Sequence, residues 1–312
     1  MEKHFELTDE TIEVAGNTMH RIRCTRDCKW AKTGDLGGFI EKEDNLSGNA
    51  WVSDNAWVYG NAQVYGDARV SGNARVYGNA WVSGDARVYD NARVSGDARV
   101  YDNAQVYGDA RVSDNARVSG NARLAGKARV AGKARVAGNA WVYGNARVSG
   151  DARVYDNAQV SGDARVSGNA WVSDNAWVYG NAQVSGDARV YDNAQVYGDA
   201  RVYGNAQVSD NAQVYGDARV SDIAWVSGNA RLAGKARVAG NDDHCGFDVF
   251  GSIGRHTHAY RTSDGGVEIT CGCFHGDIEA FEAKVRHTHG DSQYAREYLA
   301  IAHVIRVKFG LA

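Results

Sequence analysis

Residues 70–87, which read VSGNARVYGNAWVSGDAR, hold three copies of one six-residue pattern. Each copy has valine, then serine or tyrosine, then glycine with asparagine or aspartate, then alanine, then arginine or tryptophan. The valine position recurs without insertion at 32 positions from residue 52 to residue 238, with only Leu124 and Leu232 replacing valine. Leu46 and Ile40 extend the phase backwards. Such a short fixed period predicts a repeat architecture.

The pattern also predicts which side chains point inward. Because alternate residues of a strand point to opposite sides, Ala80 and Val82 face one way and Trp81 and Ser83 the other. The glycine and asparagine or aspartate pair tolerates left-handed backbone, so the chain turns there. Three such corners make a coil of about 18 residues, and parallel ladders at about 4.8 Å join the coils. The sequence predicts an all-β, three-sided solenoid of about 10 to 11 coils.

Two non-repeating segments flank the array. We expect residues 1–45 to form a small β cap, residues 46–241 the solenoid, and residues 242–312 a small α+β domain. In that domain, residues 256–262 and 267–273 flank an Asp-Gly-Gly turn, which favours a hairpin. Asp277 and Asp291 each precede a helical pattern, so we expect a ββαα module. The residues expected on the inner helix faces are Ile278, Phe281, Val285, Tyr294, Tyr298, Ile301, Ile305 and Phe309.

Composition excludes several classes of protein. The chain of 312 residues has a formal charge of −3, while residues 46–241 hold 18 Arg and 3 Lys against 18 Asp. The array is therefore neither an acidic nucleic-acid mimic nor a polybasic arm. We expect a cytoplasmic protein without a membrane segment, because no long apolar stretch or signal-like N-terminus is present. The five cysteines lie outside the repeats and are expected to be reduced thiols.

The hexad resembles the hexapeptide repeat of left-handed parallel β-helices, in which a small residue follows an aliphatic one by four positions. This resemblance covers residues 40–241. Residues 32–51, KTGDLGGFIEKEDNLSGNAW, are similar to a GDLGGFIE-type segment of poorly characterised bacterial and prophage hexapeptide proteins. Residues 250–309 resemble C-terminal domains of phage-borne members. The resemblance implies a left-handed coil and a phage or prophage origin.

Two enzyme groups with this fold place histidine on the coils. Acyltransferases of this kind use a histidine base, and γ-class carbonic anhydrases bind zinc through histidines. In this chain no histidine lies between His20 and His244, and no cysteine between Cys28 and Cys245. The coils supply neither a general base nor a zinc triad, so we expect no enzyme activity and no cofactor there.

An arginine column is the first candidate binding surface. With 18 residues per coil, one outward face collects arginines at nearly every rung, interrupted by Gln183 and preceded by Trp57. This column either grips an anionic ligand or forms a solvated surface in which each arginine pairs with a nearby turn aspartate. Its members are Arg75, Arg93, Arg111, Arg129, Arg147, Arg165, Arg201, Arg219 and Arg237.

A basic belt is the second candidate. Around residues 123–135 alanine replaces tyrosine and serine, and lysine replaces the turn acids, leaving Arg123, Lys127, Arg129, Lys133 and Arg135. A second copy with Lys235 begins 108 residues later. The belt is either functional or a product of repeat duplication, since GNAWVSDNAWVYGNAQV also recurs at residues 48 and 168. The outward Trp and Tyr residues likewise suit either packing ladders or contact surfaces.

The C-terminal segment holds the metal-ligating residue types. If Cys271, Cys273 and His275 alternate on one strand, they face the same way, and His256 and His258 lie opposite them on the partner strand. This constellation suits a soft metal such as zinc, or catalysis by a cysteine paired with histidine. The alternative is that these are ordinary core and surface residues.

We expect a non-enzymatic solenoid that acts as a rigid binding or scaffold protein, with a protein partner such as a host factor. The first alternative is a binder of nucleic acid or another anionic ligand through the arginine column and basic belts. The second places a metal or catalysis in the C-terminal domain. A homo-oligomer, trimer or dimer, is compatible with each of these hypotheses.

Overall fold

The structure is a computed structural model that describes residues 3–311. Its contacts divide it into two compact units, which separate between Asn169 and Ala170. Both units contain the repeat, and each also carries one of the two non-repeating segments.

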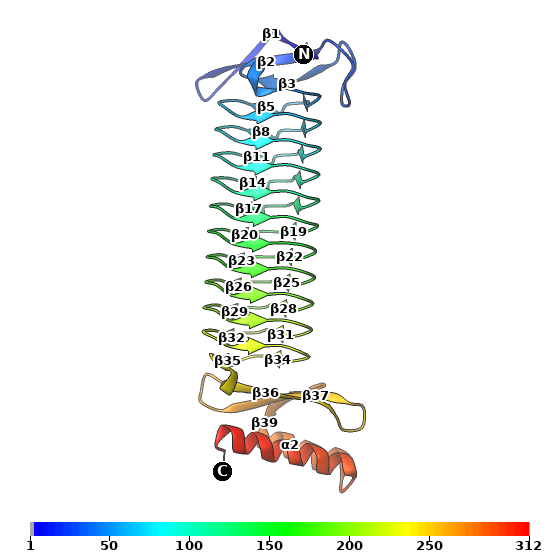
Figure 1. Cartoon of the computed structure of the whole chain (residues 1–312), viewed down its shortest axis with the longest axis vertical. Helices are drawn as coiled ribbons and strands as arrows, with labels where there is room; N and C mark the ends of the chain where they lie inside the picture. The colour runs from blue at the N-terminus through cyan, green and yellow to red at the C-terminus, as the bar shows by residue number, and fades with distance from the viewer. Residues whose placement is uncertain (1–2, 312) are drawn as a thin grey trace. The chain divides into compact units, whose positions relative to one another are not determined.

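In the first unit the hexads form three parallel sheets (Figure 1). The first sheet contains β3 (Leu36–Ile40), β5 (Trp57–Val58), β8 (Arg75–Val76), β11 (Arg93–Val94), β14 (Arg111–Val112), β17 (Arg129–Val130), β20 (Arg147–Val148) and β23 (Arg165–Val166). The second contains β4 (Trp51–Val52), β7 (Arg69–Val70), β10 (Arg87–Val88), β13 (Gln105–Val106), β16 (Arg123–Leu124), β19 (Trp141–Val142) and β22 (Gln159–Val160). The third contains β6 (Gln63–Val64), β9 (Trp81–Val82), β12 (Arg99–Val100), β15 (Arg117–Val118), β18 (Arg135–Val136) and β21 (Arg153–Val154).

Each strand pairs with the strand one coil away. β11 pairs in parallel with β8 and β14, so that Arg93 lies opposite Arg75 on one side and Arg111 on the other. The Arg93 N–H donates to the carbonyl of Ala110 at 2.9 Å, and the Ser95 N–H to that of Val112 at 2.9 Å. The predicted 18-residue coil and its parallel ladders are confirmed.

Alanine and valine fill the interior of the coils. The side chains of Ala92 and Val94 are fully buried, and the same holds for the alanine and valine positions throughout the first unit. Each buried valine contributes roughly 1.5 to 3 kcal/mol. The corners rely on left-handed backbone at glycine or aspartate, as at Gly78 (φ 73°) and Asp90 (φ 58°). The predicted inward and outward sides are therefore confirmed.

The N-terminal cap extends the first sheet. Strands β1 (Phe5–Val14) and β2 (Asn17–Cys24) are antiparallel, β2 pairs with β3, and β3 pairs in parallel with β5. A short 3-10 helix, η1 (Glu43–Asn45), leads into the coils. Met19 and Ile22 on β2 and Ile40 on β3 are fully buried. The predicted β cap is confirmed.

The second unit begins with coils of the same kind (Figure 1). Its three parallel sheets contain β26 (Gln183–Val184), β29 (Arg201–Val202), β32 (Arg219–Val220) and β35 (Arg237–Val238); β25 (Trp177–Val178), β28 (Gln195–Val196), β31 (Gln213–Val214) and β34 (Arg231–Leu232); and β24 (Trp171–Val172), β27 (Arg189–Val190), β30 (Gln207–Val208) and β33 (Trp225–Val226).

An α+β module follows the last coil, after the 3-10 helix η2 (Asn241–Asp243). Its antiparallel sheet has the order β36 (His244–Phe250), β37 (Arg255–Arg261), β38 (Val267–Cys271) and β39 (Phe274–Asp277). The hairpin of β37 and β38 was predicted, whereas β36 and β39 were not. The predicted ββαα arrangement is wrong in this respect, because two further strands flank the hairpin.

Two helices cover one side of this sheet. In α1 (Ile278–His289) the Asp277 carboxylate accepts from the Ala280 N–H at 2.8 Å, which confirms the predicted cap. In α2 (Gln293–Phe309) the cap is the Ser292 hydroxyl, which accepts from the Ala295 N–H at 3.3 Å. The prediction of Asp291 was therefore one residue early.

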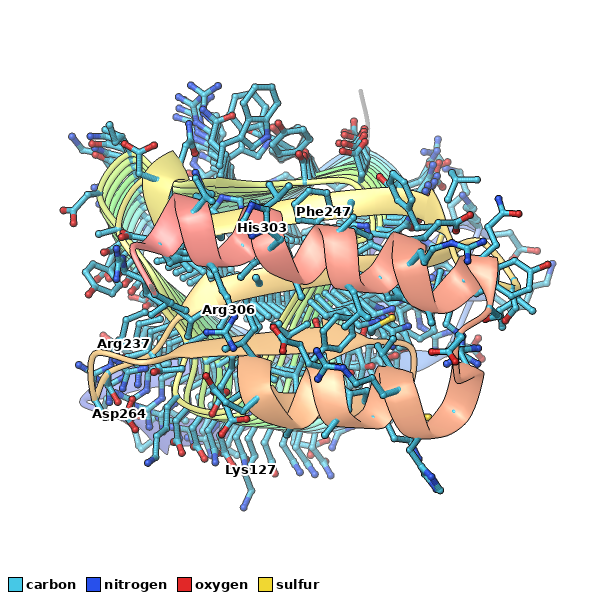
Figure 2. The ribbon with its side chains drawn as sticks, turned by 90° about the horizontal axis from the view of Figure 1, so that it is seen from below. Lys127, Arg237, Phe247, Asp264, His303 and Arg306 are labelled. Atoms are coloured by element: carbon cyan, nitrogen blue, oxygen red, sulfur yellow. The ribbon has the colours of Figure 1, made fainter. Side chains whose placement is uncertain are left out.

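The helices pack on the sheet through one apolar cluster and meet each other through an ion pair. The predicted inner residues are buried, except Tyr294, which is 42 % exposed. Between the helices the Arg306 Nε donates to Glu282 at 2.9 Å, as the position of Arg306 in Figure 2 illustrates. Among the described residues, no helix has the length and apolar character that crossing a membrane requires.

Candidate anion-binding face

Six arginines stack on the outward side of the first sheet of the first unit. In the strand registers each arginine lies opposite the arginine of the next coil. The series is Arg75, Arg93, Arg111, Arg129, Arg147 and Arg165. We call this set the arginine face. At about 4.8 Å per rung it extends for about 24 Å. In the second unit, Gln183, Arg201, Arg219 and Arg237 occupy the corresponding strands, as predicted.

A groove of about 450 Å³ lies along four rungs of the arginine face, from Arg75 to Arg129. Turn residues form one of its sides, and Lys127 adds a further cation, which Figure 2 shows projecting outward. Asp109 is the single acid among the lining residues, set against five cations. The lining residues are Asn73, Arg75, Asn91, Arg93, Asp109, Arg111, Lys127 and Arg129.

The arginines of this face have no carboxylate partner in the described part of the chain. No guanidinium of Arg93, Arg111, Arg129, Arg147 or Arg165 lies within 4.0 Å of a carboxylate oxygen. The interpretation in which each arginine pairs with a nearby turn aspartate is therefore wrong for this face.

Several turn acids have partners one coil away. Asn145 donates its side-chain amide to the Asp163 carboxylate at 3.0 Å, and Asn79 donates to Asp97 at 2.9 Å. At turns that begin with aspartate, the carboxylate instead accepts a backbone N–H, as Asp90 does from Gly108 at 3.0 Å. These carboxylates thus brace the corners and do not pair with the guanidinium groups of the arginine face.

Stacked like charges cost free energy. Neighbouring unit charges about 4 Å apart repel by about 1 kcal/mol even at the dielectric constant of water, and directly opposed like charges destabilise strand pairs. Guanidinium groups suit carboxylate, sulfate and phosphate groups, to which they donate two parallel hydrogen bonds. An anion in the groove relieves the repulsion, and the arrangement is chemically suited to bind one.

Aromatic residues mostly stabilise the coils rather than add to the groove. Tyr59 and Tyr77 stack at 5.1 Å between ring centroids, and Arg75 lies 4.2 Å from the Trp57 ring centroid. In the second unit Tyr179, Tyr197 and Tyr215 form a three-rung stack with centroids 4.8 and 5.1 Å apart. The packing-ladder interpretation therefore holds for these rings, while Trp141, at 41 % exposure, remains open to contact.

The first basic belt is spread over all three sheets. Arg123 lies on β16, Arg129 on β17 and Arg135 on β18, while Lys127 and Lys133 lie in the turns between them. Arg123 stacks on Trp141, 5.3 Å from the ring centroid. The belt therefore encircles one coil, and only Lys127 and Arg129 belong to the groove of the arginine face.

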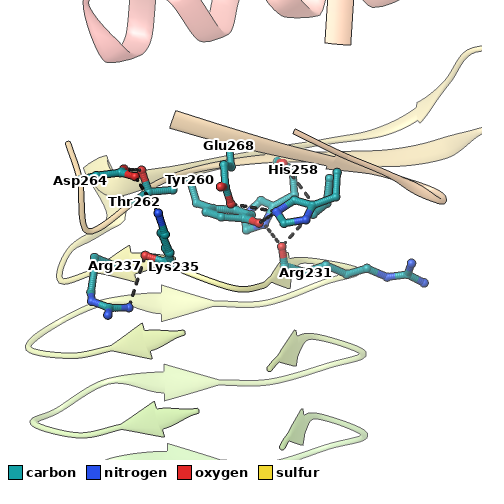
Figure 3. A network of polar contacts seen from close by, with 10 residues as sticks. Arg231, Lys235, Arg237, His258, Tyr260, Thr262, Asp264 and Glu268 are labelled. Atoms are coloured by element: carbon teal, nitrogen blue, oxygen red, sulfur yellow. Dashed lines mark hydrogen bonds and ion pairs between the residues drawn. The ribbon is translucent and has the colours of Figure 1, made fainter. Parts of the chain in front are cut away.

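The second basic stretch holds the C-terminal module (Figure 3). The Lys235 ammonium pairs with Asp264 at 3.3 Å, and the Ser263 N–H donates to the Lys235 carbonyl at 3.0 Å. Arg231 donates to the Gly272 carbonyl at 3.3 Å, and its own carbonyl accepts from the Thr270 hydroxyl at 3.2 Å. These contacts give this copy a structural role within the second unit.

The five residues predicted as metal ligands do not gather in one place. Cys271 ends β38 and packs among the helix residues, whereas Cys273 lies exposed in the turn before β39. They are therefore not on one strand, and the predicted alternation with His275 is wrong. His256 and His258 belong to the opposite side of the sheet, where His258 contacts the Arg231 carbonyl at 3.3 Å. Within residues 3–311, no three His, Cys, Asp or Glu side chains form a group able to hold a metal ion.

A cysteine nucleophile has little support from the geometry. No imidazole of the described residues is hydrogen bonded to a cysteine sulfur, and Cys271 instead accepts from the Thr257 hydroxyl at 3.2 Å. Burial raises the pKa of the Cys245 thiol to about 11, which disfavours its thiolate. Cys271 and Cys273 do line a cavity of about 220 Å³ together with Arg255 and Lys284.

Three histidines that face the last coil form a cluster. The Nδ1 of His244 lies 3.0 Å from the Nε2 of His258, and the His256 and His258 ring centroids are 5.7 Å apart. Burial, followed by the charge of His244, lowers the pKa of His258 to about 3. Burial also lowers the pKa of His244. Burial therefore disfavours the charged forms of His244 and His258, and both side chains contribute to packing of the module.

Sequence reasoning missed the role of Trp30 in the first unit. Its indole N–H donates to the Asp67 carbonyl at 2.7 Å, and the guanidinium groups of Arg69 and Arg87 lie 5.6 and 5.2 Å from its ring centroid. Lys29 also forms ion pairs with Asp67 and Asp85. The sequence feature that could have revealed this role is that Trp30 is a lone tryptophan in a polar segment before the coils. Such a residue indicates a side chain that packs against the repeat.

The coils and their charged outer face define a β-solenoid repeat protein. Comparison with protein families agrees, because stretches between residues 62 and 228 are similar to the YdcK β-solenoid repeat. The matched residues are 62–74, 68–84, 86–102, 92–108, 104–120, 110–126, 140–156, 146–162, 158–174, 182–195, 194–210 and 212–228. A comparison with curated proteins found no match.

Proposed function

We propose that the protein is a non-enzymatic β-solenoid that binds an anionic partner through the arginine face. The observation that carries the proposal is the unpaired ladder of arginines along a groove of about 450 Å³. Repulsion between neighbouring guanidinium groups favours any ligand that brings compensating negative charge. Residue types support the absence of catalysis, since the coils carry no histidine, cysteine or glutamate.

The wider biological setting belongs to the same proposal. The resemblance of residues 40–241 supports a left-handed hexapeptide coil, that of residues 32–51 and 250–309 supports a phage or prophage origin, and the composition supports a cytoplasmic location. In this setting, one candidate for the anionic partner is a host protein with an acidic surface. Side-by-side association into dimers or trimers is compatible with the exposed tryptophans.

The direct test is binding of inorganic polyphosphate, which offers charge without bases or sugars. In the test variant Arg93, Arg111 and Arg129 are changed to Gln. The matched control changes Arg99, Arg117 and Arg135 to Gln, because these arginines stack on another sheet of the same unit and alter the net charge equally. We expect at least a tenfold loss of affinity in the test variant and less than a threefold loss in the control.

Two outcomes contradict the proposal. Absence of polyphosphate binding by the unchanged protein at low salt excludes an anion-binding face. Equal losses in the two variants mean that net charge, not the arginine face, attracts the polymer. Circular dichroism of both variants checks that the coils remain folded; five of the six substituted side chains are exposed and Arg93 is half-buried.

A further inference from the structure

We infer that the ligand of the arginine face is an acidic polysaccharide whose chain runs along the stacking direction, one sugar against each rung. This inference rests on the proposed function, because it presumes that the face binds anions. It is carried by three observations: the spacing of the charges, the absence of aromatic platforms beside them, and the polar side chains on both flanks.

The charges form a straight line with a short, constant repeat. Arg75 to Arg165 occupy successive rungs in register, so positive charge recurs at about 4.8 Å over about 24 Å. In an extended peptide, side chains on one face recur only every second residue, at about 6.6 Å. This spacing does not match the spacing of about 4.8 Å between rungs. A polysaccharide of pyranose sugars advances by one ring and one bridging oxygen per sugar. This advance is close to the distance between two neighbouring rungs.

The groove lacks what single-stranded nucleic acid requires. Proteins that bind such strands stack bases on aromatic side chains. Two residues after each arginine, on the same outward side, the chain has Tyr77 only at the first rung. The following positions are small, namely Ser95, Ser113, Ala131, Ser149 and Ser167. From Arg93 onward the face thus offers bases no ring to stack on.

The flanks instead offer hydrogen-bonding groups suited to sugar hydroxyls. Along one edge lie Asn73 and Asn91, followed by Asp109 and Lys127. The Asn73 amide donates to Asn91 at 3.3 Å, and each amide keeps further donors and acceptors free. The Asp109 carboxylate suits a sugar hydroxyl but not a sugar carboxylate or sulfate. Ser95 and Ser113 are half-buried along the other edge. Guanidinium groups between these edges would pair with carboxylate or sulfate groups of the sugars, while the amides and hydroxyls contact the ring oxygens and hydroxyls.

The lining also explains why a polymer, and not one small anion, fits. Arginines from four successive rungs, Arg75 to Arg129, line the groove, which therefore extends over about 14 Å along the stacking direction. A single sulfate therefore meets only one or two guanidinium groups in water, where each pairing is weak. Successive charges on one chain engage successive rungs, and the later contacts form at a high effective concentration.

The test uses a length series of heparin oligosaccharides, polygalacturonate oligomers as the carboxylated counterpart, and single-stranded dT oligonucleotides of equal charge. We expect affinity for the favoured sugar series to rise steeply with length and to level off at about five to six sugars, the number that spans the six rungs. The dT oligonucleotide of equal charge should bind at least tenfold more weakly. Changing Arg147 and Arg165 to Gln should shorten the levelling-off length by about two sugars.

The alternative outcomes distinguish failure of the polysaccharide inference from failure of the proposed function. If dT binds as tightly as the sugars, or if affinity does not depend on length, the polysaccharide assignment fails while polyphosphate binding keeps the anion-binding face. If Arg147→Gln and Arg165→Gln leave the levelling-off length unchanged, the ligand does not run along the ladder. If no anion binds, including polyphosphate, both proposals fail.

Discussion

At the scale of single residues, the corner positions decide whether coils stack in register. Glycines there have positive φ, and a Cβ on Gly138 would meet the Asp156 backbone nitrogen at 2.8 Å. Aspartate is nevertheless accepted at the same position because its carboxylate binds the N–H of the next coil, as Asp102 does with Gly120 at 3.0 Å. The hydrogen bond offsets the strain of left-handed backbone.

Asp102 therefore provides a residue-scale prediction. Asp102→Ala keeps the Cβ at φ 59° but removes the acceptor, so we expect a loss of about 1 kcal/mol in unfolding free energy. Asp102→Asn keeps an acceptor and a residue that tolerates this backbone region, and should stay close to the unchanged protein. Urea unfolding followed by circular dichroism measures both. Equal destabilisation by Asn and Ala would show that the hydrogen bond has no role.

The sequence predicted the interior residues correctly because the six-residue period assigns one side to every position. The sequence did not predict the hydrogen-bond partners of the aspartates in the turns. Asp67 and Arg69 are close in sequence, yet Asp67 accepts from Asn49, one coil earlier, at 3.1 Å. The relevant neighbours in a solenoid lie 18 residues away, and reading the columns at that offset would have revealed the asparagine and aspartate ladders.

At the scale of elements, the C-terminal module depends on a buried neutral histidine. His258 on β37 is fully enclosed between its sheet and the last coil, and burial lowers its pKa to about 3. Groups that face the cluster include Asp248, which pairs with His256 at 2.6 Å, and Lys308, whose positive charge adds to burial in lowering the pKa of His244. No carboxylate is in contact with His258 itself among the described residues.

This geometry predicts acid lability of the module. The unfolded chain binds a proton at His258 near pH 6.5, whereas the folded state does so only near pH 3. The contribution of His258 to the unfolding free energy is therefore at its maximum above about pH 6.5. It decreases progressively as pH falls towards 3, by up to about 1.4 kcal/mol per pH unit. Hydrogen exchange of β37 and β38 amides between pH 7 and pH 4 measures this slope after correction for intrinsic exchange.

The matched variants are His258→Asn and His287→Gln. His258→Asn removes the more deeply buried of the two histidines with lowered pKa values and should reduce the slope, whatever its effect on absolute stability. His287 lies exposed on α1, and its replacement should leave the slope unchanged. An unchanged slope in His258→Asn would show that another group controls the acid response.

The sequence was less informative about elements outside the repeat. The hairpin of β37 and β38 was found because an Asp-Gly-Gly turn separates two strand-like runs, and the Asp277 cap because a helical pattern follows it. β36 and β39 were missed, since HCGFDVF and FHGD each contain glycine and show no clean alternation. Sheet pairing stabilises these strands, and pairing between distant segments is not visible in local pattern.

At the scale of the whole molecule, charge is distributed unevenly. The formal charge is −3, yet the arginine face collects six stacked cations within one unit. Net charge alone would not suggest anion binding, whereas the column read at 18-residue spacing does. The sequence therefore predicted the location of the candidate face, but only the structure shows that its arginines lack carboxylate partners.

The salt dependence of polyphosphate binding tests the central claim most directly. Each charge neutralised on a polyanion contributes roughly 0.7 to 0.9 to the slope of log affinity against log salt concentration. Replacing Arg93, Arg111 and Arg129 by Gln should therefore reduce the magnitude of that slope by about 2. The variant with Arg99, Arg117 and Arg135 replaced should retain the slope of the unchanged protein. A slope that is the same in all three proteins would contradict binding at the arginine face.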